Sequence, residues 1–309
     1  MPFFIECNLV IVLVDAYFKV IKDKGNAVID DPLRPKVGLA LGGGAGLGWA
    51  HIGVIRVLQE NNIPIDMIAG CSIGAIVGAC VAADKLDHLE DLARSITLKE
   101  MLLFSDPSFK KGSVLGARKI TSIFKEHLGD DLIEELAMPF AAVAADLYTG
   151  ERVVLDSGSL IEAARASSAV PGVFPPILKG AQLLADGGTV DPIPVEAVQV
   201  MGAEMIIAVD LQGDYGGRAR RMGLEVGKDM KRGAAMRIAR AGMLMALTNL
   251  GKETLKRCPP DTLITPAIGH IEMADFTQAA VLIELGRKAA LAAMPEILEN
   301  LNKKRAQST

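Results

Sequence analysis

The chain has 309 residues, 50% of them hydrophobic and 23% charged, a composition that supports a large buried core and excludes an intrinsically disordered chain. The net charge of −4 excludes the overall positive field of a nucleic-acid-binding protein, so no nucleic-acid partner is expected. The four cysteines lack the paired spacing of a metal site or of a dense disulfide framework, which predicts a cytoplasmic location.

Residues 1–35 are predicted to form an N-terminal extension that ends in a proline-containing linker. Glu6 lies where a secretion signal would be basic, and no small-residue cleavage site follows it. The apolar run at residues 9–14 is shorter than the ~20 residues that span a bilayer. We expect this segment to pack on the domain. Two alternatives remain: a peripheral contact with the inner face of a membrane, and a contact between the subunits of a homodimer.

The remainder of the chain alternates between strand and helix patterns. An apolar strand at residues 37–41 leads into a glycine loop at residues 42–48, and a helix follows in which apolar residues recur at helical spacing. A short strand at residues 66–69 leads into a turn at residues 70–74 and an alanine-rich helix. Further strands are predicted at residues 140–147, 153–155, 205–211 and 262–264, and further helices at residues 159–166, 195–200, 234–256 and 276–291. This order predicts an α/β fold with a mostly parallel sheet flanked by helices.

Ser72 is a candidate nucleophile because it lies in a Gly-x-Ser-x-Gly pattern between a strand and a helix. The small flanking residues let the chain bend sharply, so the hydroxyl is presented at the edge of the sheet. The positive end of the following helix favours the oxyanion that forms when such a serine attacks an ester. For the pentapeptide alone, a purely structural turn is the alternative.

The glycine loop, Gly42 to Gly48, directs several backbone N–H groups toward one point, which suits either a phosphate or a tetrahedral oxyanion. A dinucleotide-binding loop requires Gly-x-Gly-x-x-Gly, and Leu47 and Trp49 take the place of the last glycine in the two available frames. No Gly-Lys-Ser/Thr follows, so the loop is not a P-loop.

Asp186 lies on a second tight turn. It follows an apolar run and precedes Gly187 and Gly188, so its carboxylate lies where another backbone segment can approach closely. This motif alone is equally typical of an Asx turn without a chemical role.

The three motifs, in this order, resemble those of the patatin-like phospholipase family, most closely its bacterial members with a compact patatin domain. Two further segments are similar to the family: residues 48–54, after the glycine loop, and residues 166–172, before the Asp-Gly-Gly turn. The resemblance implies a three-layer α/β sandwich. Its catalytic core would comprise residues 36–212, and a helical part at residues 213–309 would complete the same domain.

The resemblance also implies a serine acyl hydrolase that releases fatty acid from lipid esters, with phospholipids or lysophospholipids as substrates. Ser72 would attack the ester carbonyl, Asp186 would accept its proton, and the N–H groups of Gly43, Gly44 and Ala45 would bind the oxyanion. Water would then release the fatty acid from an acyl-enzyme, so neither a metal nor an organic cofactor is needed. An aspartate ordinarily has a pKa of ~3.9, so the site must be partly desolvated for Asp186 to act as the base.

Two positions depart from the family pattern. Leu47 stands where the loop usually carries Arg or Lys, and Ala45 stands where Gly is common. An alanine keeps its N–H group, so the oxyanion hole survives this change. The missing cation weakens the case that the loop binds a phosphate.

Two alternative functions are kept. An α/β-hydrolase with a Ser-Asp-His triad would need a histidine after the acid, and His270 is the one that qualifies. A non-catalytic regulator would keep the fold and bind acyl chains or a protein partner, and Leu47 is the reason to retain it. In addition, one helical stretch is predicted to pack in the core or to line an acyl channel; its residues are Met236, Met243, Leu244, Met245, Leu247 and Leu250.

Overall fold

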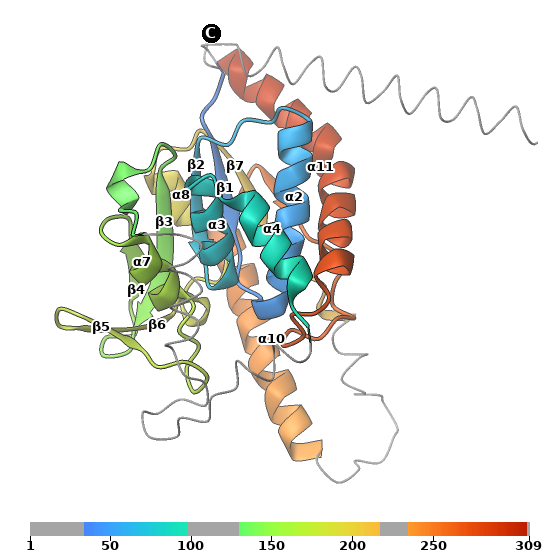
Figure 1. Cartoon of the computed structure of the whole chain (residues 1–309). Helices are drawn as coiled ribbons and strands as arrows, with labels where there is room; N and C mark the ends of the chain where they lie inside the picture. The colour runs from blue at the N-terminus through green and yellow to red at the C-terminus, as the bar shows by residue number, and fades with distance from the viewer. Residues whose placement is uncertain (1–33, 98–129, 217–233, 308–309) are drawn as a thin grey trace, which may run out of the picture.

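The computed structural model describes residues 34–97, 130–216 and 234–307 (Figure 1). The predictions for residues 1–33, including their contact with a membrane or with a second subunit, lie outside the described residues. Within the described ranges, no helix is both long enough and apolar enough to cross a bilayer.

One mixed sheet forms the centre of the fold. Its strands are β1 (Val37–Leu41), β2 (Met67–Cys71), β3 (Phe140–Asp146), β4 (Arg152–Leu155), β5 (Ile177–Lys179), β6 (Gln182–Asp186), β7 (Met205–Val209) and β8 (Thr262–Ile264). They lie in the order β5-β6-β3-β2-β1-β7-β8, with β4 paired to β3. The neighbouring strands β3, β2, β1, β7 and β8 are parallel to one another, whereas β4, β5 and β6 form antiparallel pairs. The predicted fold class, a mostly parallel sheet flanked by helices, is confirmed.

Helices cover both faces of this sheet and produce three layers. The helices are α2 (Trp49–Glu60), α3 (Ile73–Ala82), α4 (Leu86–Ser95), α7 (Leu160–Ser167), α8 (Val195–Val200), α10 (Ala234–Arg257) and α11 (Ala279–Gln307), with short 3-10 turns η1 (Ala45–Gly48), η3 (Ile133–Glu135) and η4 (Gly187–Thr189). Successive side chains of a strand point to opposite faces. Leu39 and Leu41 therefore enter a large core with α2, α3, α4, α7 and α11. Ala40 enters a second core with α8 and Leu255 of α10.

Helices α2 and α11 lie side by side and touch through glycines (Figure 1). A Cβ atom on Gly53 would lie 1.9 Å from the carbonyl oxygen of Ile283, and one on Gly286 would lie 2.0 Å from that of Ala50. The two backbones are therefore in direct contact, and a side chain at either glycine would force the helices apart.

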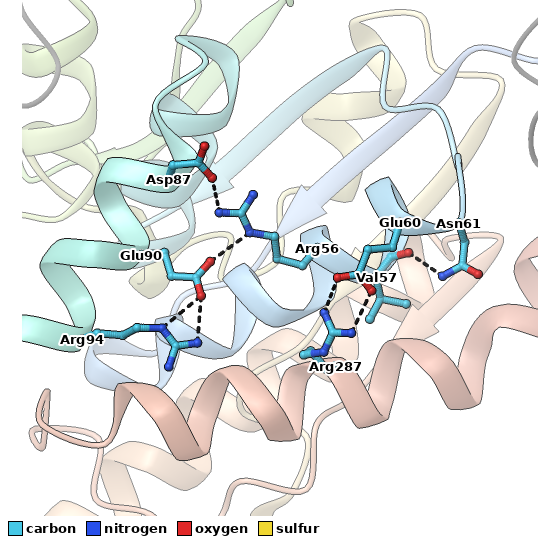
Figure 2. Close-up of polar contacts among 8 residues, drawn as sticks. All are labelled: Arg56, Val57, Glu60, Asn61, Asp87, Glu90, Arg94 and Arg287. Carbon is cyan, nitrogen blue, oxygen red and sulfur yellow. Dashed lines mark hydrogen bonds and ion pairs between the residues drawn. The ribbon is translucent and has the colours of Figure 1, made fainter. Parts of the chain in front are cut away.

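Ion pairs connect α2 to the helices on either side of it (Figure 2). Arg56 of α2 donates to Glu90 of α4 at 2.9 Å and also pairs with Asp87. Arg287 of α11 donates through both terminal nitrogens to Glu60 of α2, each at 2.7 Å. Because these groups are partly exposed, each pair contributes only about 0–1 kcal/mol to stability. The pairs orient helices that apolar packing holds together.

The boundaries differ from the predictions where tertiary packing decides them. Helix α11 continues to Gln307, past the predicted end at residue 291 and through Pro295, because Ile297 and Leu301 extend its buried face. Helix α4 and the strands β5 and β6 are absent from the sequence-based prediction. β6 pairs with β3, and β5 pairs with β6, so these two strands join the sheet through contacts with segments that are distant in the sequence or lie across a turn.

Candidate active site

Three neighbouring parallel strands end at the same edge of the sheet. β1 continues into the glycine loop, β2 into the turn at Ser72, and β7 into Asp210 and Gln212. β1 lies between β2 and β7, and the three run in one direction. The segments therefore meet at the carboxyl edge of the sheet, where α/β proteins bind their ligands.

Ser72 and Asp186 come together because β2 and β6 meet end to end along one edge of β3. Cys71, the last residue of β2, pairs with Val143, and Asp186, the last residue of β6, pairs with Ala144. β4 pairs along the opposite edge of β3. The Ser72 hydroxyl donates a hydrogen bond of 2.6 Å to Asp186 Oδ2, although the two residues are 114 positions apart in the sequence.

Ser72 has a backbone conformation that residues with a side chain rarely adopt, with φ 55° and ψ −124°. The flanking glycines permit this turn. A Cβ atom on Gly70 would lie 2.3 Å from the carbonyl oxygen of Gly74, and one on Gly74 would lie 2.2 Å from that of Leu41. Ser72 is the N-cap residue of α3, so the positive end of that helix faces the serine. The predicted strand–turn–helix context of this residue is present.

Asp186 is 6% exposed, and both of its carboxylate oxygens accept hydrogen bonds. Oδ2 accepts from Ser72, and Oδ1 accepts from the N–H of Gly188 at 2.8 Å. Asp186 therefore forms the Asx turn with Gly188 and also contacts Ser72. Burial raises the pKa of Asp186 from its ordinary value of 3.8 to about 6, against the lowering effect of the two hydrogen bonds. Asp186 is ionised at neutral pH and is a stronger base than a solvated aspartate.

The N–H groups of the glycine loop are not all free. Gly42 donates to the carbonyl of Val209, and Gly43 donates to the carbonyl of Pro192, each at 3.0 Å. Gly43 was one of three predicted oxyanion donors, and its N–H is occupied in this structure. The N–H groups of Gly44 and Ala45 make no hydrogen bond with the described residues.

The carbonyl groups of the same loop are held by two buried side chains. His51 Nε2 donates to the carbonyl of Gly42 at 2.8 Å, and Gln212 Nε2 donates to that of Gly43 at 3.3 Å. Burial lowers the pKa of His51 to about 4, so the ring is neutral at pH 7. The N–H of Gly44 belongs to the peptide group whose carbonyl faces Gln212. Because the peptide is trans, that N–H points the opposite way.

The two departures from the family pattern have structural explanations. Ala45 has a φ of 49°, in the left-handed region that glycine adopts without steric cost, which explains a preference for glycine there. Leu47 is fully buried in the large core. Its side chain therefore fills the interior, and the loop presents no cation at this position.

His270, the histidine that a triad would require, is exposed. Among the described residues, no imidazole hydrogen-bonds to Ser72 or Asp186, and His51 donates to the glycine loop instead. The same part of the chain contains no cluster of three His, Cys, Asp or Glu residues arranged to hold a metal ion. The arrangement favours a serine–aspartate pair over a triad.

The structure places the residues of the predicted core or channel stretch in different surroundings. Leu244 of α10 is buried and packs with Ala241 in a small core. Met243 and Met245 of α10 are 60% and 49% exposed, so neither packs in the core. Leu247 of the same helix lines a small pocket with Gly43 and Ile193. Of Met243, Leu244, Met245 and Leu247, Leu247 is the one that lines this pocket.

Sequence reasoning did not identify the partners that hold these groups. Gln212 follows β7, and its position at the carboxyl edge of a strand next to β1 was the available signal. Pro192 contributes a backbone carbonyl, which no side-chain pattern reveals. Ser167 lies in residues 166–172, which resemble the family, but the pattern gave it no chemical role.

The sequence of this chain is similar to those of known proteins. The model of the family described as "Patatin-like phospholipase" matches residues 39–198. An uncharacterised NTE family protein of Mycobacterium tuberculosis is 44% identical over 186 residues, which cover 60% of this chain and 52% of that protein. Neuropathy target esterase sws of Drosophila melanogaster is 32% identical over 182 residues, covering 57% and 13% of the two chains. The crystal structure of VipD from Legionella pneumophila has a TM-score of 0.48 at 13% identity, covering 87% of this chain and 67% of that one. The matched region spans about half the length of the mycobacterial relative.

Proposed function

The chain belongs to the patatin-like phospholipase family, whose model matches just over half of its residues, and we propose that it is a serine acyl hydrolase that releases fatty acid from lipid esters through Ser72 and Asp186. The observation that carries the proposal is the 2.6 Å hydrogen bond from the Ser72 hydroxyl to the buried carboxylate. The N–H groups of Gly44 and Ala45, which have no hydrogen-bond partner among the described residues, support the same chemistry.

In the first half of the reaction, the Ser72 oxygen attacks the ester carbonyl carbon while its proton passes to Asp186 Oδ2. The carbonyl oxygen becomes an oxyanion, which the N–H groups of Gly44 and Ala45 bind. The bond to the leaving alcohol then breaks, and the alcohol takes the proton from Asp186. The product of this half is an ester between the acyl group and Ser72.

In the second half, water replaces the alcohol. Asp186 removes a proton from the water while the water oxygen attacks the carbonyl carbon of the acyl-enzyme. The N–H groups of Gly44 and Ala45 bind the new oxyanion. The bond to the Ser72 oxygen breaks, the serine recovers the proton, and the fatty acid leaves. The two halves together consume one water and return the site to its starting state.

The raised pKa of Asp186 suits this role. A carboxylate with a pKa of about 6 is ionised at pH 7 yet accepts a proton more readily than an ordinary aspartate, and a general base works best when its pKa is near the working pH. Direct contact with the hydroxyl removes the need for an imidazole between the two groups.

Phospholipids and lysophospholipids are the proposed substrates. The Drosophila relative is named an esterase, which supports ester hydrolysis by the matched region. Because Leu47 is buried, the glycine loop supplies no charge for a phosphate, so recognition of a head group must rest on other residues. A substrate panel should therefore include neutral acyl esters beside the charged lipids.

The test combines hydrolysis of this panel with labelling by a fluorophosphonate, which reacts with activated serines. Ser72→Ala should abolish both signals and leave the fold intact. Asp186→Asn should lower the hydrolysis rate by about 10³-fold or more, because an amide cannot accept the proton. His270→Ala is the matched control and should retain most of the activity.

Two outcomes would contradict the proposal. A folded His270→Ala protein as inactive as Ser72→Ala would indicate a triad. A wild-type protein that neither hydrolyses the panel nor reacts with the fluorophosphonate would indicate a non-catalytic binding protein.

A further inference from the structure

The segment at the end of α7 contacts both members of the proposed dyad. It comprises residues 167–169, Ser-Ser-Ala, and it lies where β2 and β6 meet along β3. The mechanism above uses no residue of this segment.

Ser167 is fully buried, and its hydroxyl makes two short hydrogen bonds. The hydroxyl donates to the carbonyl of Val143 on β3 at 2.6 Å, and it accepts from the backbone N–H of Ser72 at 2.9 Å. The hydroxyl therefore connects the nucleophile's own peptide group to the central strand.

The register of the sheet explains why a hydroxyl is needed there. In the parallel ladder between β2 and β3, the N–H of Ile68 donates to the carbonyl of Pro139. Such bonds repeat every second residue, so the ladder continues through Gly70 and would then, four residues after Ile68, bring the N–H of Ser72 to the carbonyl of Val143. The chain turns at Ser72 instead, and the hydroxyl of Ser167 is inserted between these two groups.

Ala169 makes the corresponding contact with the base. Its carbonyl accepts a hydrogen bond of 2.9 Å from the backbone N–H of Asp186. Residues 167 and 169 thus hold the backbones of Ser72 and Asp186 from one short segment. A displacement of either end changes the separation of the two side chains.

We propose that Ser167 is a positioning residue, whose inserted hydroxyl, together with the carbonyl of Ala169, holds Ser72 at hydrogen-bonding distance from Asp186. This inference rests on the function proposed above. Without the hydroxyl, the N–H of Ser72 is drawn toward the free carbonyl of Val143, and the Ser72 side chain moves away from the carboxylate. The positive φ of Ser72 also persists only while its surroundings enforce it.

The adjacent residue provides a matched control. The hydroxyl of Ser168 donates to the carbonyl of Ala164 within α7 at 2.7 Å, and its hydrogen bonds go to this helix and not to Ser72 or Asp186. Ser168→Ala removes the same group one position away, next to the same helix end. A general weakening of α7 would affect both variants, whereas positioning of the dyad would affect Ser167→Ala alone.

The experiment compares wild type, Ser167→Ala and Ser168→Ala in ester hydrolysis and in titration of the Asp186 carboxyl group by carbon-13 NMR. Ser167→Ala should lower kcat by about 10-fold to 100-fold with KM nearly unchanged, since small displacements of reacting groups carry penalties of this size. The bond from Ser72 lowers the pKa of Asp186, so its weakening should move the titration midpoint upward from about 6. Ser168→Ala should match wild type in both measurements.

The NMR titration separates failure of this inference from failure of the proposed function. If wild type hydrolyses no ester but the midpoint of Asp186 still rises in Ser167→Ala, the positioning role stands and the proposed activity fails. If Ser167→Ala hydrolyses at the wild-type rate with an unchanged midpoint, or if Ser168→Ala loses as much, the inference is wrong. Should Ser167→Ala not fold, Ser167→Cys keeps the shape of the side chain and a weak hydrogen-bonding group. The same decrease in kcat and the same upward shift of the midpoint are then expected, each smaller than in Ser167→Ala.

Discussion

Replacing Asp186 with asparagine should make the protein more stable at neutral pH while it removes activity. Burial raises the pKa of this carboxyl from 3.8 to about 6, which means that the folded protein binds a proton more readily than the unfolded chain. Between these two pH values the folded state carries more protons, so the free energy of unfolding decreases as the pH rises. Asparagine does not titrate and is free of this penalty.

The magnitude follows from the two pKa values. Each pH unit between them is worth about 1.4 kcal/mol, so the penalty for burying the charged form reaches about 3 kcal/mol above pH 6. Well below pH 4 the carboxyl is protonated in both states and the penalty disappears. The difference in unfolding free energy between Asp186→Asn and wild type should therefore grow between pH 4 and pH 6 and then level off at no more than about 3 kcal/mol.

Urea unfolding at half-unit steps from pH 4 to pH 7.5 measures this difference directly. Asp66→Asn is the control of opposite sign. Burial raises the pKa of Asp66, but its hydrogen bonds from Arg34 and from the Val37 N–H outweigh burial and lower it. Its replacement should destabilise the protein by an amount that stays constant above pH 4. A stability difference for Asp186→Asn that does not change with pH would refute the reasoning, as would a pH–rate profile with its acid limb near pH 4.

Three further predictions concern packing and the glycine loop. Gly286→Ala should destabilise the protein by ~1–3 kcal/mol, because its Cβ would collide with the backbone of α2. Gly242→Ala, whose Cβ meets nothing within 4 Å, should instead stabilise α10 by up to ~1 kcal/mol, and urea unfolding measures both variants. Gln212→Met should lower kcat by about 10-fold at constant KM, because it removes the hydrogen bond that orients the peptide group of the Gly44 N–H. This loss is smaller than the ~10²-fold or more that follows complete removal of an oxyanion donor. The exposed Gln199→Met should have no effect, and an equal loss in both variants would count against the role of Gln212. Leu47→Lys should lower the urea midpoint far more than Leu47→Met, because it places an ammonium group in the core; equal midpoints would show that the lysine reaches solvent.

Local sequence patterns were sufficient for much of this protein. Apolar runs of strand length, separated by helical repeats, predicted the central parallel strands, because both faces of those strands are buried and the whole strand is apolar. The turn at Ser72 was equally predictable, since the glycines at positions 70 and 74 are the local condition for a sharp strand-to-helix bend. The pattern also named Asp186, through the two glycines that follow it.

Tertiary structure decided how those residues are connected. The hydrogen bond between Ser72 and Asp186 depends on β2 and β6 meeting along β3, and β6 becomes a strand only by pairing. Likewise, no local pattern shows that the N–H of Gly43 is occupied by a carbonyl from residue 192, or that Ser167 completes the ladder beside the nucleophile. Turns and strand propensity depend on neighbours in the sequence. Hydrogen bonds between distant segments depend on sheet register and strand order, which arise only when the whole core packs.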